Sequence, residues 1–208
     1  MTNIFKPKVH VELEKLSEAL KIPNEVFEIA KSVALKMGYH YSGKLAEANA
    51  IASLYYACRV KMIPITLEEI VEEMFKLKQP KKSYIEISKY VSWMMRETRR
   101  QFIEITGVFG NVPRMPPSLF IPKIAEKIGL PNEIVEKAIE ISGKAYEIGL
   151  DLARNPISIV AASIYIACIL CGEPRRQKDI AEASKINEVT LRNRYKELNA
   201  KLDFGIEV

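Results

Sequence analysis

The stretch that decides the fold is Ala50–Glu72, AIASLYYACRVKMIPITLEEIVE, because it recurs as Val160–Glu182, VAASIYIACILCGEPRRQKDIAE. The two segments align at an offset of 110 without a gap, and eight of their 23 positions are identical. A second match lies upstream at an offset of 108, where Pro23-Asn24-Glu25 returns as Pro131-Asn132-Glu133. Two matches in the same order and at nearly the same offset indicate a tandem repeat of roughly 100 residues per copy.

The chain of 208 residues is long enough for one large domain or two small ones, and the repeat favours two. Apolar residues make up 48% and charged residues 27%, which supplies a core and excludes intrinsic disorder as the main state. The net charge of +5 is compatible with a nucleic-acid partner, but a basic protein without one would show the same bias.

Helical patterns fill both copies, and short alternating strand patterns are almost absent. We predict an all-α protein of two tandem five-helix bundles, residues 8–105 and 118–203, joined by a linker at 106–117 that contains two glycines and three prolines. The expected helices are about 8–20, 24–38, 44–61, 66–76 and 83–103, then 118–128, 132–150, 156–171, 176–183 and 188–202.

Start signals support two of these helices. Thr66-Leu-Glu-Glu69 is a capping box, and Asn155-Pro156 places a capping side chain before a proline at the first helical position. The third helix of each copy is apolar and rich in small residues on nearly all sides. We therefore predict that it forms the hub of its bundle, surrounded by the other helices.

Cys168-Ile-Leu-Cys171 has the spacing of half a zinc site, but no second pair follows. The counterpart of Cys168 is Cys58, and Lys61 stands where that cysteine would need its partner, so we interpret the shared cysteine as a packing residue. We expect no metal and no cofactor. Phosphate-binding loops and nucleophile motifs are also missing, so we do not expect an enzyme.

The longest apolar run, Ile157–Cys171, is shorter than the ~20 residues that a bilayer requires. We accordingly expect a soluble, intracellular protein without a membrane partner.

The second copy ends in Arg176–Leu202, which predicts a short helix, a tight turn at Ser184–Asn187 and a longer helix capped by Asn187. In the longer helix, one apolar stripe should face the bundle; it consists of Leu191, Tyr195, Leu198 and Leu202. A second stripe should point outward; it consists of Val189, Arg192, Asn193 and Lys196.

The outward stripe suits base reading in a major groove. Arginine can donate two hydrogen bonds to guanine, asparagine can pair with adenine, and the exposed Val189 could contact a thymine methyl group. Basic residues in and around the stripe could reach phosphates: Arg175, Arg176, Lys178, Lys185, Arg194 and Lys196. Helix-turn-helix geometry also occurs in bundles that bind no DNA, and that alternative stays open on spacing alone.

Glu188–Leu198, EVTLRNRYKEL, preceded by Arg176-Gln-Lys-Asp-Ile-Ala-Glu182, resembles the end of the second cyclin repeat in archaeal transcription factor B, the counterpart of eukaryotic TFIIB. The stretches ASLYYACR and AASIYIAC resemble the signature of that family's third helix in both repeats. The similarity runs from about Val9 to Leu202.

The resemblance implies two cyclin-like folds that clamp the TATA-binding protein on promoter DNA. The second-repeat helix-turn-helix would read the B recognition element upstream of the TATA box, while the first repeat would touch downstream DNA and help to receive RNA polymerase. Carried over by position, Val189 and Arg192 would read bases, with Gln177, Thr190 and Arg194 as backbone or secondary contacts. The resemblance also implies a location in the cytoplasm of a prokaryotic cell, in association with the nucleoid. We expect a monomer.

The sequence departs from the family in two ways. No cysteine precedes Cys58, so we expect no zinc ribbon, and fewer than ten residues precede the first repeat, so we expect no reader segment. Recruitment of polymerase should then be poor. A core fragment and a short regulatory paralogue both fit this expectation.

The first repeat also departs from the family. Its segment Met74–Ser83 is longer and more basic than the corresponding turn of the family, and the helix that follows it lacks the Val-Thr-x-Arg pattern. Its basic residues could contact phosphates or an acidic partner: Lys76, Lys78, Lys81, Lys82, Arg96, Arg99 and Arg100. A cyclin-like interaction module that binds no DNA is the alternative function.

Overall fold

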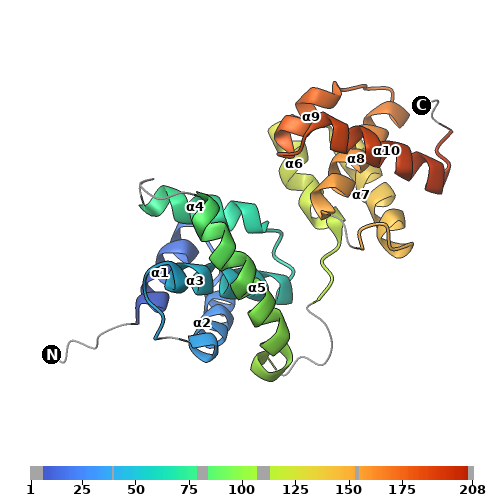
Figure 1. Ribbon diagram of the computed structural model, residues 1–208. Helices are drawn as coiled ribbons and strands as arrows, with labels where there is room; N and C mark the ends of the chain where they lie inside the picture. The colour runs from blue at the N-terminus through green and yellow to red at the C-terminus, as the bar shows by residue number, and fades with distance from the viewer. Residues whose placement is uncertain (1–6, 39, 79–83, 107–112, 153–154, 206–208) are drawn as a thin grey trace. The chain divides into compact units, whose positions relative to one another are not determined.

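The computed structural model describes residues 7–38, 40–78, 84–106, 113–152 and 155–205 (Figure 1). Within these ranges the chain is all α, with ten α-helices and one short 3-10 helix, as the sequence predicts. The chain separates into two compact units, Met1–Arg114 and Met115–Val208. The described helices include none that is both long and apolar enough to cross a membrane.

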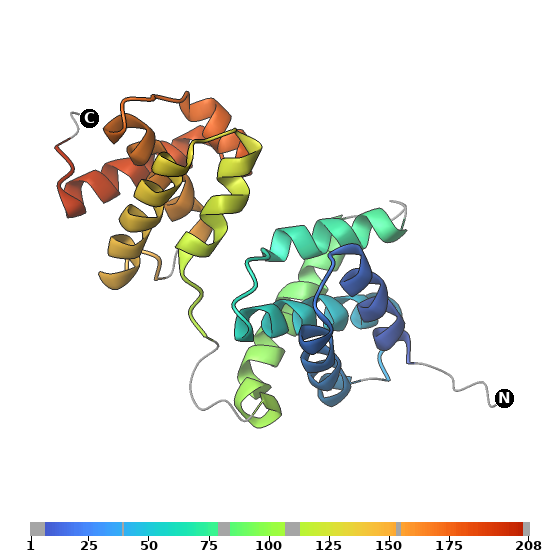
Figure 2. The same cartoon turned by 180° about the vertical axis from the view of Figure 1, so that it is seen from behind.

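The first unit contains five helices, α1 (Lys8–Ala19), α2 (Asn24–Gly38), α3 (Gly43–Val60), α4 (Leu67–Lys78) and α5 (Tyr84–Thr106). Helices α1 and α2 lie side by side, as the view from behind shows in blue (Figure 2). The second unit contains the 3-10 helix η1 (Pro117–Phe120), then α6 (Ile121–Lys127), α7 (Asn132–Glu147), α8 (Pro156–Leu170), α9 (Gln177–Ala183) and α10 (Glu188–Leu202).

The third helix of each repeat is the hub of its unit, as predicted. Helix α3 packs against α1, α2, α4 and α5, and α8 packs against η1, α6, α7, α9 and α10. Consecutive residues on each hub are buried, because neighbours cover every side: Ala48–Leu54 on α3 and Ile157–Ile164 on α8. Cys58 and Cys168 are both fully buried in these cores, as expected for packing residues.

Several predicted helix boundaries differ from the structure by a few residues; the fifth helix, for example, ends at Thr106 instead of about 103. Two of the differences have a clear local cause. The sixth helix begins as the 3-10 turn η1, because Pro122 cannot donate a helical hydrogen bond and its ring would clash with the carbonyl of Ser118 in a continuous α-helix. The seventh ends at Glu147 instead of about 150, since Gly149 takes the left-handed φ of 75°.

The predicted caps form. In the capping box, the Glu69 backbone N–H donates to Thr66 Oγ1 (3.1 Å) and the Thr66 N–H donates to Glu69 Oε2 (3.0 Å). The Asn155 side chain accepts from the Ile157 N–H at 3.0 Å, directly before Pro156 at the first position of α8. The Asn155 cap and Pro156 thus fix the start of α8, the apolar hub of the second unit.

Asn49 is a fully buried polar residue in the first hub. Its Nδ2 donates to the carbonyls of Ala34 (3.0 Å) and Gly38 (3.4 Å) near the end of α2, and its Oδ1 accepts from the Ser53 hydroxyl at 2.9 Å. The corresponding residue of the second repeat, at the offset of 110, is Ile159, which packs in an apolar core. At this position, therefore, the hub of the first repeat is hydrogen-bonded to the neighbouring helix α2 by a side chain, whereas the hub of the second repeat makes only apolar contacts.

The two repeats also end their hub helices differently. In each, a backbone bond closes the turn, from Ile63 N–H to Cys58 O (2.8 Å) and from Glu173 N–H to Cys168 O (3.0 Å). The residue inside this turn is left-handed in both copies, but it is Gly172 (φ 75°) in the second and Met62 (φ 54°) in the first. A side chain in this conformation is strained, so Met62 costs stability that glycine would not.

We expect Asn49→Ile to lower the free energy of unfolding by about 1–3 kcal/mol, because it removes the buried side-chain bonds to the end of α2 and leaves the Ser53 hydroxyl without its acceptor. Urea denaturation followed by circular dichroism measures this change. Ser53→Ala is the matched control and should cost less, since it removes one bond and leaves the α2 carbonyls satisfied. An unchanged midpoint for Asn49→Ile would contradict the prediction.

We expect Met62→Gly to raise the free energy of unfolding by about 0.5–1 kcal/mol, because relief of the left-handed strain exceeds the entropy that glycine adds to the unfolded chain. Gly172→Ala is the reciprocal test and should destabilise by about 1 kcal/mol through the backbone alone, since a Cβ there meets no atom within 4 Å. Thermal unfolding of both variants tests the two predictions. Midpoint temperatures that shift in the same direction in both variants would refute them.

Candidate nucleic-acid interface

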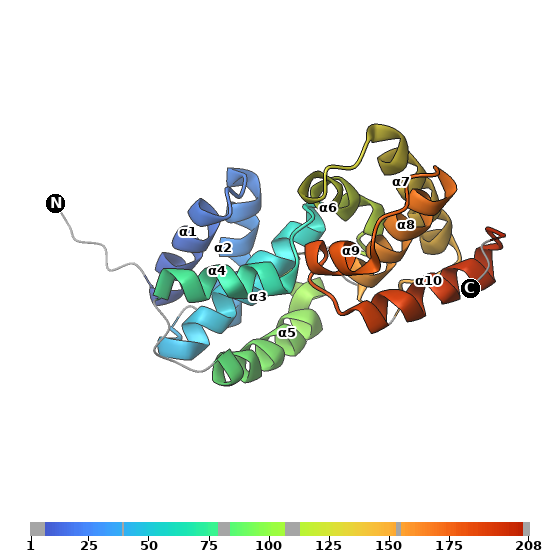
Figure 3. The ribbon, with the colours of Figure 1, turned by 90° about the horizontal axis from the view of Figure 1, so that it is seen from above.

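Helices α9 and α10 form a helix-turn-helix, and they lie side by side in the second unit (Figure 3). Lys185 takes a left-handed φ of 55° in the turn between them, and the Ile186 N–H donates to the Ala181 carbonyl at 3.0 Å. Asn187 then caps α10 through its side-chain oxygen, which accepts from the Thr190 N–H at 2.7 Å. The turn and the cap together fix where α10 begins.

The inner side of α10 packs on the hub α8. Leu191 and Leu198 are fully buried, and Tyr195 is 9% exposed with its ring 4.9 Å from that of Tyr165 on α8. Leu202 packs against the same core. These are the four residues that the spacing assigns to the inner stripe, so the orientation of the helix is set by the core.

The opposite side of α10 presents Val189, Arg192, Asn193 and Lys196, and all four are exposed. Val189 is 61% exposed, the highest value among the large apolar side chains for which the structure describes exposure. An apolar side chain in this position adds nothing to the core. The surface formed by Val189, Arg192, Asn193 and Lys196, here termed the α10 outer face, thus combines an apolar group with donors and acceptors.

Arg192 is connected to the rest of the helix-turn-helix through Gln177, the first residue of α9. The Arg192 Nε donates to Gln177 Oε1 at 3.4 Å, and Gln177 Nε2 donates to the Tyr165 hydroxyl at 3.1 Å. Spacing within α10 could not reveal this connection, because the three residues lie on three helices.

Basic side chains near the start of α9 are held by neighbouring carboxylates. Arg176 donates two hydrogen bonds to Asp179, at 2.8 and 2.9 Å, which raises the pKa of Arg176 and lowers that of Asp179. Longer ion pairs join Arg175 to Glu173 (3.9 Å) and Lys178 to Glu182 (3.8 Å). Exposed pairs of this kind contribute little to stability, so these cations can exchange their carboxylates for phosphates.

Arg194 does not fit the expected role of an exposed phosphate contact. It is 9% exposed and pairs with Glu197 on the same helix. The physical reason is its register, three residues after the buried Leu191, which turns its stem toward the bundle. The Thr190 side chain is half-buried, and its backbone N–H is occupied by the Asn187 cap.

Of the basic residues proposed in the first repeat, Arg96, Arg99 and Arg100 are exposed on α5. Arg100 lies 3.9 Å from Glu97, and Lys76 on α4 pairs with Glu73 at 2.8 Å. Lys81 and Lys82 lie outside the described residues, as does the Lys78 side chain.

Helix α5 also exposes two aromatic side chains that the sequence reasoning did not single out. Tyr90 and Trp93 are 40% and 42% exposed, one helical turn apart, and the Lys44 ammonium lies 6.0 Å from the Tyr90 ring centroid. The three-residue spacing of Tyr90, Trp93 and Arg96 was the available signal for a shared face.

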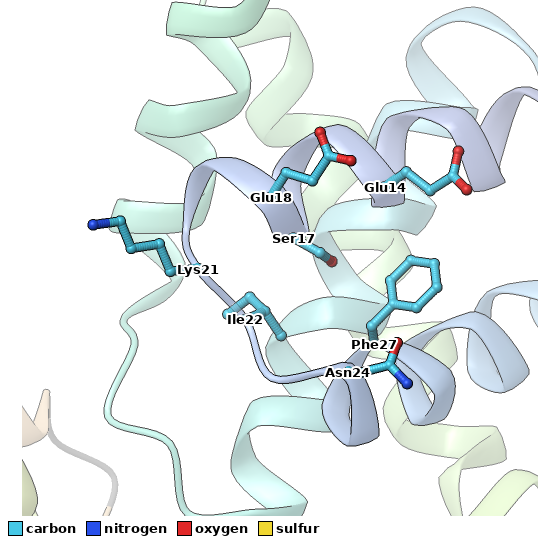
Figure 4. Close-up of a pocket in the computed structure, with 7 residues that line it drawn as sticks. All are labelled: Glu14, Ser17, Glu18, Lys21, Ile22, Asn24 and Phe27. Atoms are coloured by element: carbon cyan, nitrogen blue, oxygen red, sulfur yellow. The ribbon is translucent and has the colours of Figure 1, made fainter.

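A pocket of about 320 Å³ opens between the end of α1 and the start of α2 (Figure 4). Its lining mixes both charges with apolar groups: Glu14, Ser17, Glu18, Lys21, Ile22, Asn24 and Phe27. Lys21 points away from the other side chains, and the Glu14 carboxylate accepts from the Nε2–H of the His10 ring at 3.1 Å. The pocket and the α10 outer face belong to different units and are separate features.

The cysteines are free thiols, and burial raises the pKa of Cys58 to about 12 and that of Cys168 to about 11. Neither thiol is therefore ionised near neutral pH, so neither is a ready metal ligand. Among the residues that the structure describes, His, Cys, Asp and Glu form no group of three or more that could hold a metal ion.

Comparison with known proteins identifies the family. Residues 111–201 match the family "Transcription factor TFIIB repeat". The chain is 36% identical over 200 residues to Transcription initiation factor IIB of Pyrobaculum islandicum and 37% identical over 201 residues to that of Archaeoglobus fulgidus, in each case over 95% of this chain. The chain belongs to the TFIIB family.

Transcription initiation factor IIB 1 of Thermococcus kodakarensis is a further relative of this TFIIB-family chain, with 33% identity over 203 residues. The aligned region covers 95% of this chain but 55% of the Pyrobaculum protein, 56% of the Archaeoglobus protein and 62% of the Thermococcus protein. The chain thus spans little more than half the length of these relatives.

In this TFIIB-family chain we expect Arg194→Ala to lower the free energy of unfolding by about 1–3 kcal/mol, because it removes a mostly buried charge-assisted pair. Lys196→Ala, two residues further along α10, is the exposed control and should change stability by less than about 0.5 kcal/mol. Urea denaturation of both variants measures the difference. Equal stability of the two variants would show that the Arg194 pair contributes nothing to folding.

Proposed function

We propose that this chain is an initiation factor that binds promoter DNA together with the TATA-binding protein and reads the upstream B recognition element through α10. The observation that carries the proposal is the α10 outer face, with Val189 61% exposed beside Arg192. Membership of the TFIIB family supports the same function.

The α10 outer face has the chemistry for base recognition in a major groove. The Arg192 guanidinium can donate to O6 and N7 of guanine, and the Asn193 amide can pair with N6 and N7 of adenine. Val189 can contact the methyl group of thymine. All three lie in the first half of α10, the end that a recognition helix inserts between the DNA backbones.

The cations around this surface are the proposed phosphate contacts. Lys196 continues the outer face along α10, while Arg175 and Arg176 flank the start of α9. Their exposed ion pairs with Glu173 and Asp179 would be replaced by phosphates, because a phosphate attracts a guanidinium at least as strongly. Binding should therefore weaken steeply with salt.

For the first repeat we propose a supporting role through α5. Arg96, Arg99 and Arg100 are exposed there and would meet downstream DNA or an acidic surface of RNA polymerase. These contacts need no base specificity.

A gel-shift assay tests the proposed function. The chain is added to a TATA-box promoter fragment that carries bound TATA-binding protein, at low salt. A slower band is expected, and its formation should depend on the sequence upstream of the TATA box. If no slower band forms at any protein concentration up to tens of micromolar, the chain is not a promoter-binding factor, and the cyclin-like interaction module becomes the better assignment.

We expect Arg192→Ala to weaken binding by about 1–3 kcal/mol on fragments with the preferred upstream sequence and by much less on a scrambled upstream sequence. The reason is that a base contact is lost only where the matching base is present. Arg96→Ala is the comparison variant, and it should weaken binding to both fragments equally. Equal losses on both fragments for Arg192→Ala would identify that residue as a phosphate contact instead.

A further inference from the structure

Three side chains from three helices form a hydrogen-bonded series that ends at the α10 outer face. The Tyr165 hydroxyl of α8 accepts from Gln177 Nε2 at 3.1 Å, and Gln177 Oε1 accepts from Arg192 Nε at 3.4 Å. Gln177 is half-buried, whereas Arg192 is exposed. The series thus runs from the hub helix to the guanidinium that we assign to base reading.

We propose that Gln177 and Tyr165 are positioning residues that hold the Arg192 guanidinium in the orientation needed to read a base. Gln177 therefore acts through Arg192 and not by contacting the DNA backbone. This inference rests on the proposed function, and it adds two specificity-determining residues outside α10.

The hydrogen bond to Gln177 leaves the Nη donors of Arg192 available for a base. A guanidinium carries five N–H donors, and the bond to Gln177 uses the one on Nε. The four donors on the two Nη atoms remain available, and an adjacent pair of N–H groups can bind O6 and N7 of guanine. A bond through Nε thus fixes the plane of the guanidinium without consuming the donors that would recognise the base.

The other end of the series is rigid. Tyr165 belongs to α8, whose neighbouring residues are fully buried, and its ring lies 4.9 Å from that of Tyr195 on α10. The amide of Gln177 can satisfy both bonds at once because it has an acceptor on one side and donors on the other. Restricting the long arginine side chain before binding reduces the entropy that would be lost on the DNA.

The repeat provides an internal comparison. The residue that corresponds to Gln177 at the offset of 110 is Leu67, whose side chain has no hydrogen-bonding group. The tyrosine is retained as Tyr55, but there its hydroxyl accepts from Arg59 Nη1 at 3.3 Å, within α3. The hydrogen bond between the hub tyrosine and a side-chain amide on the following helix is therefore found in the second repeat and not at the corresponding positions of the first.

A double-mutant cycle on DNA tests the inference. Gln177→Met preserves the side-chain length and removes both hydrogen bonds, and Tyr165→Phe preserves the ring and removes the hydroxyl. Each should reduce the ratio of affinities for preferred and scrambled upstream sequences by about 3–10-fold, and Gln177→Met should change this ratio by less than about 1.5-fold when Arg192 is already alanine.

Tyr146→Phe, on α7 of the same unit, is the matched control and should leave the ratio unchanged. A loss from Gln177→Met that is equal on both sequences, or that persists in the Arg192→Ala background, would overturn the inference in favour of a direct backbone contact.

A measurement without DNA separates this inference from the proposed function. In ¹⁵N NMR spectra of the free protein, the Arg192 Nε–H signal, assigned with Arg192→Lys, should show restricted motion. It should become mobile in Gln177→Met and stay restricted in Gln177→Glu, which keeps an acceptor. A mobile signal in the unmodified protein would overturn the positioning role whatever the DNA result. A restricted signal in a protein that does not bind promoter DNA would instead contradict the proposed function alone.

Discussion

Burial of the two hub helices is the constraint on which the rest of the structure depends. Helices α3 and α8 are apolar on nearly every side, so each is stable only when other helices surround it. The surrounding helices must in turn be amphipathic, with one side for the hub and one for water. At roughly 25 cal/mol per Å² of apolar surface, this burial is the main driving force for each unit.

The position of the candidate interface follows from the same constraint. Leu191, Tyr195 and Leu198 must face α8, and this leaves Val189, Arg192 and Asn193 no side except the solvent side. The helix cannot rotate to present other residues without exposing three large apolar side chains. The core of the second repeat therefore determines which residues are available to a partner, and the cap at Asn187 determines where they begin along the helix axis.

Much of this arrangement could be predicted from sequence, because periodicity and local capping signals are encoded within a few residues. The repeat predicted two hubs, the stripe at Leu191 predicted the inner side of α10, and Thr66 and Asn155 predicted two helix starts. The burial of Arg194 could also have been predicted, since its register three residues after Leu191 already places its stem toward the core.

Other features depend on contacts between distant residues and could not be predicted this way. The bonds of Gln177 to Tyr165 and Arg192 span 12 and 15 residues, and those of Asn49 to α2 depend on how two helices are packed. The left-handed conformation of Met62 was hidden because methionine is not a residue that turn patterns favour. The DNA and partner contacts remain predictions.

The equivalent tyrosines of the two hubs have different neighbours, and this limits how freely the repeats could be exchanged. In the first repeat, Arg59 stacks on the Tyr55 ring, with 5.7 Å from the guanidinium to its centroid. Arg59 also donates to the Pro113 carbonyl through Nε and Nη2, at 3.3 and 3.0 Å, so it anchors the chain where it leaves that unit. The second repeat has Ile169 at that position and could not provide this anchor. Two halves with the same architecture have thus become specialised modules, and a chimera with two copies of either would lose what the other supplies.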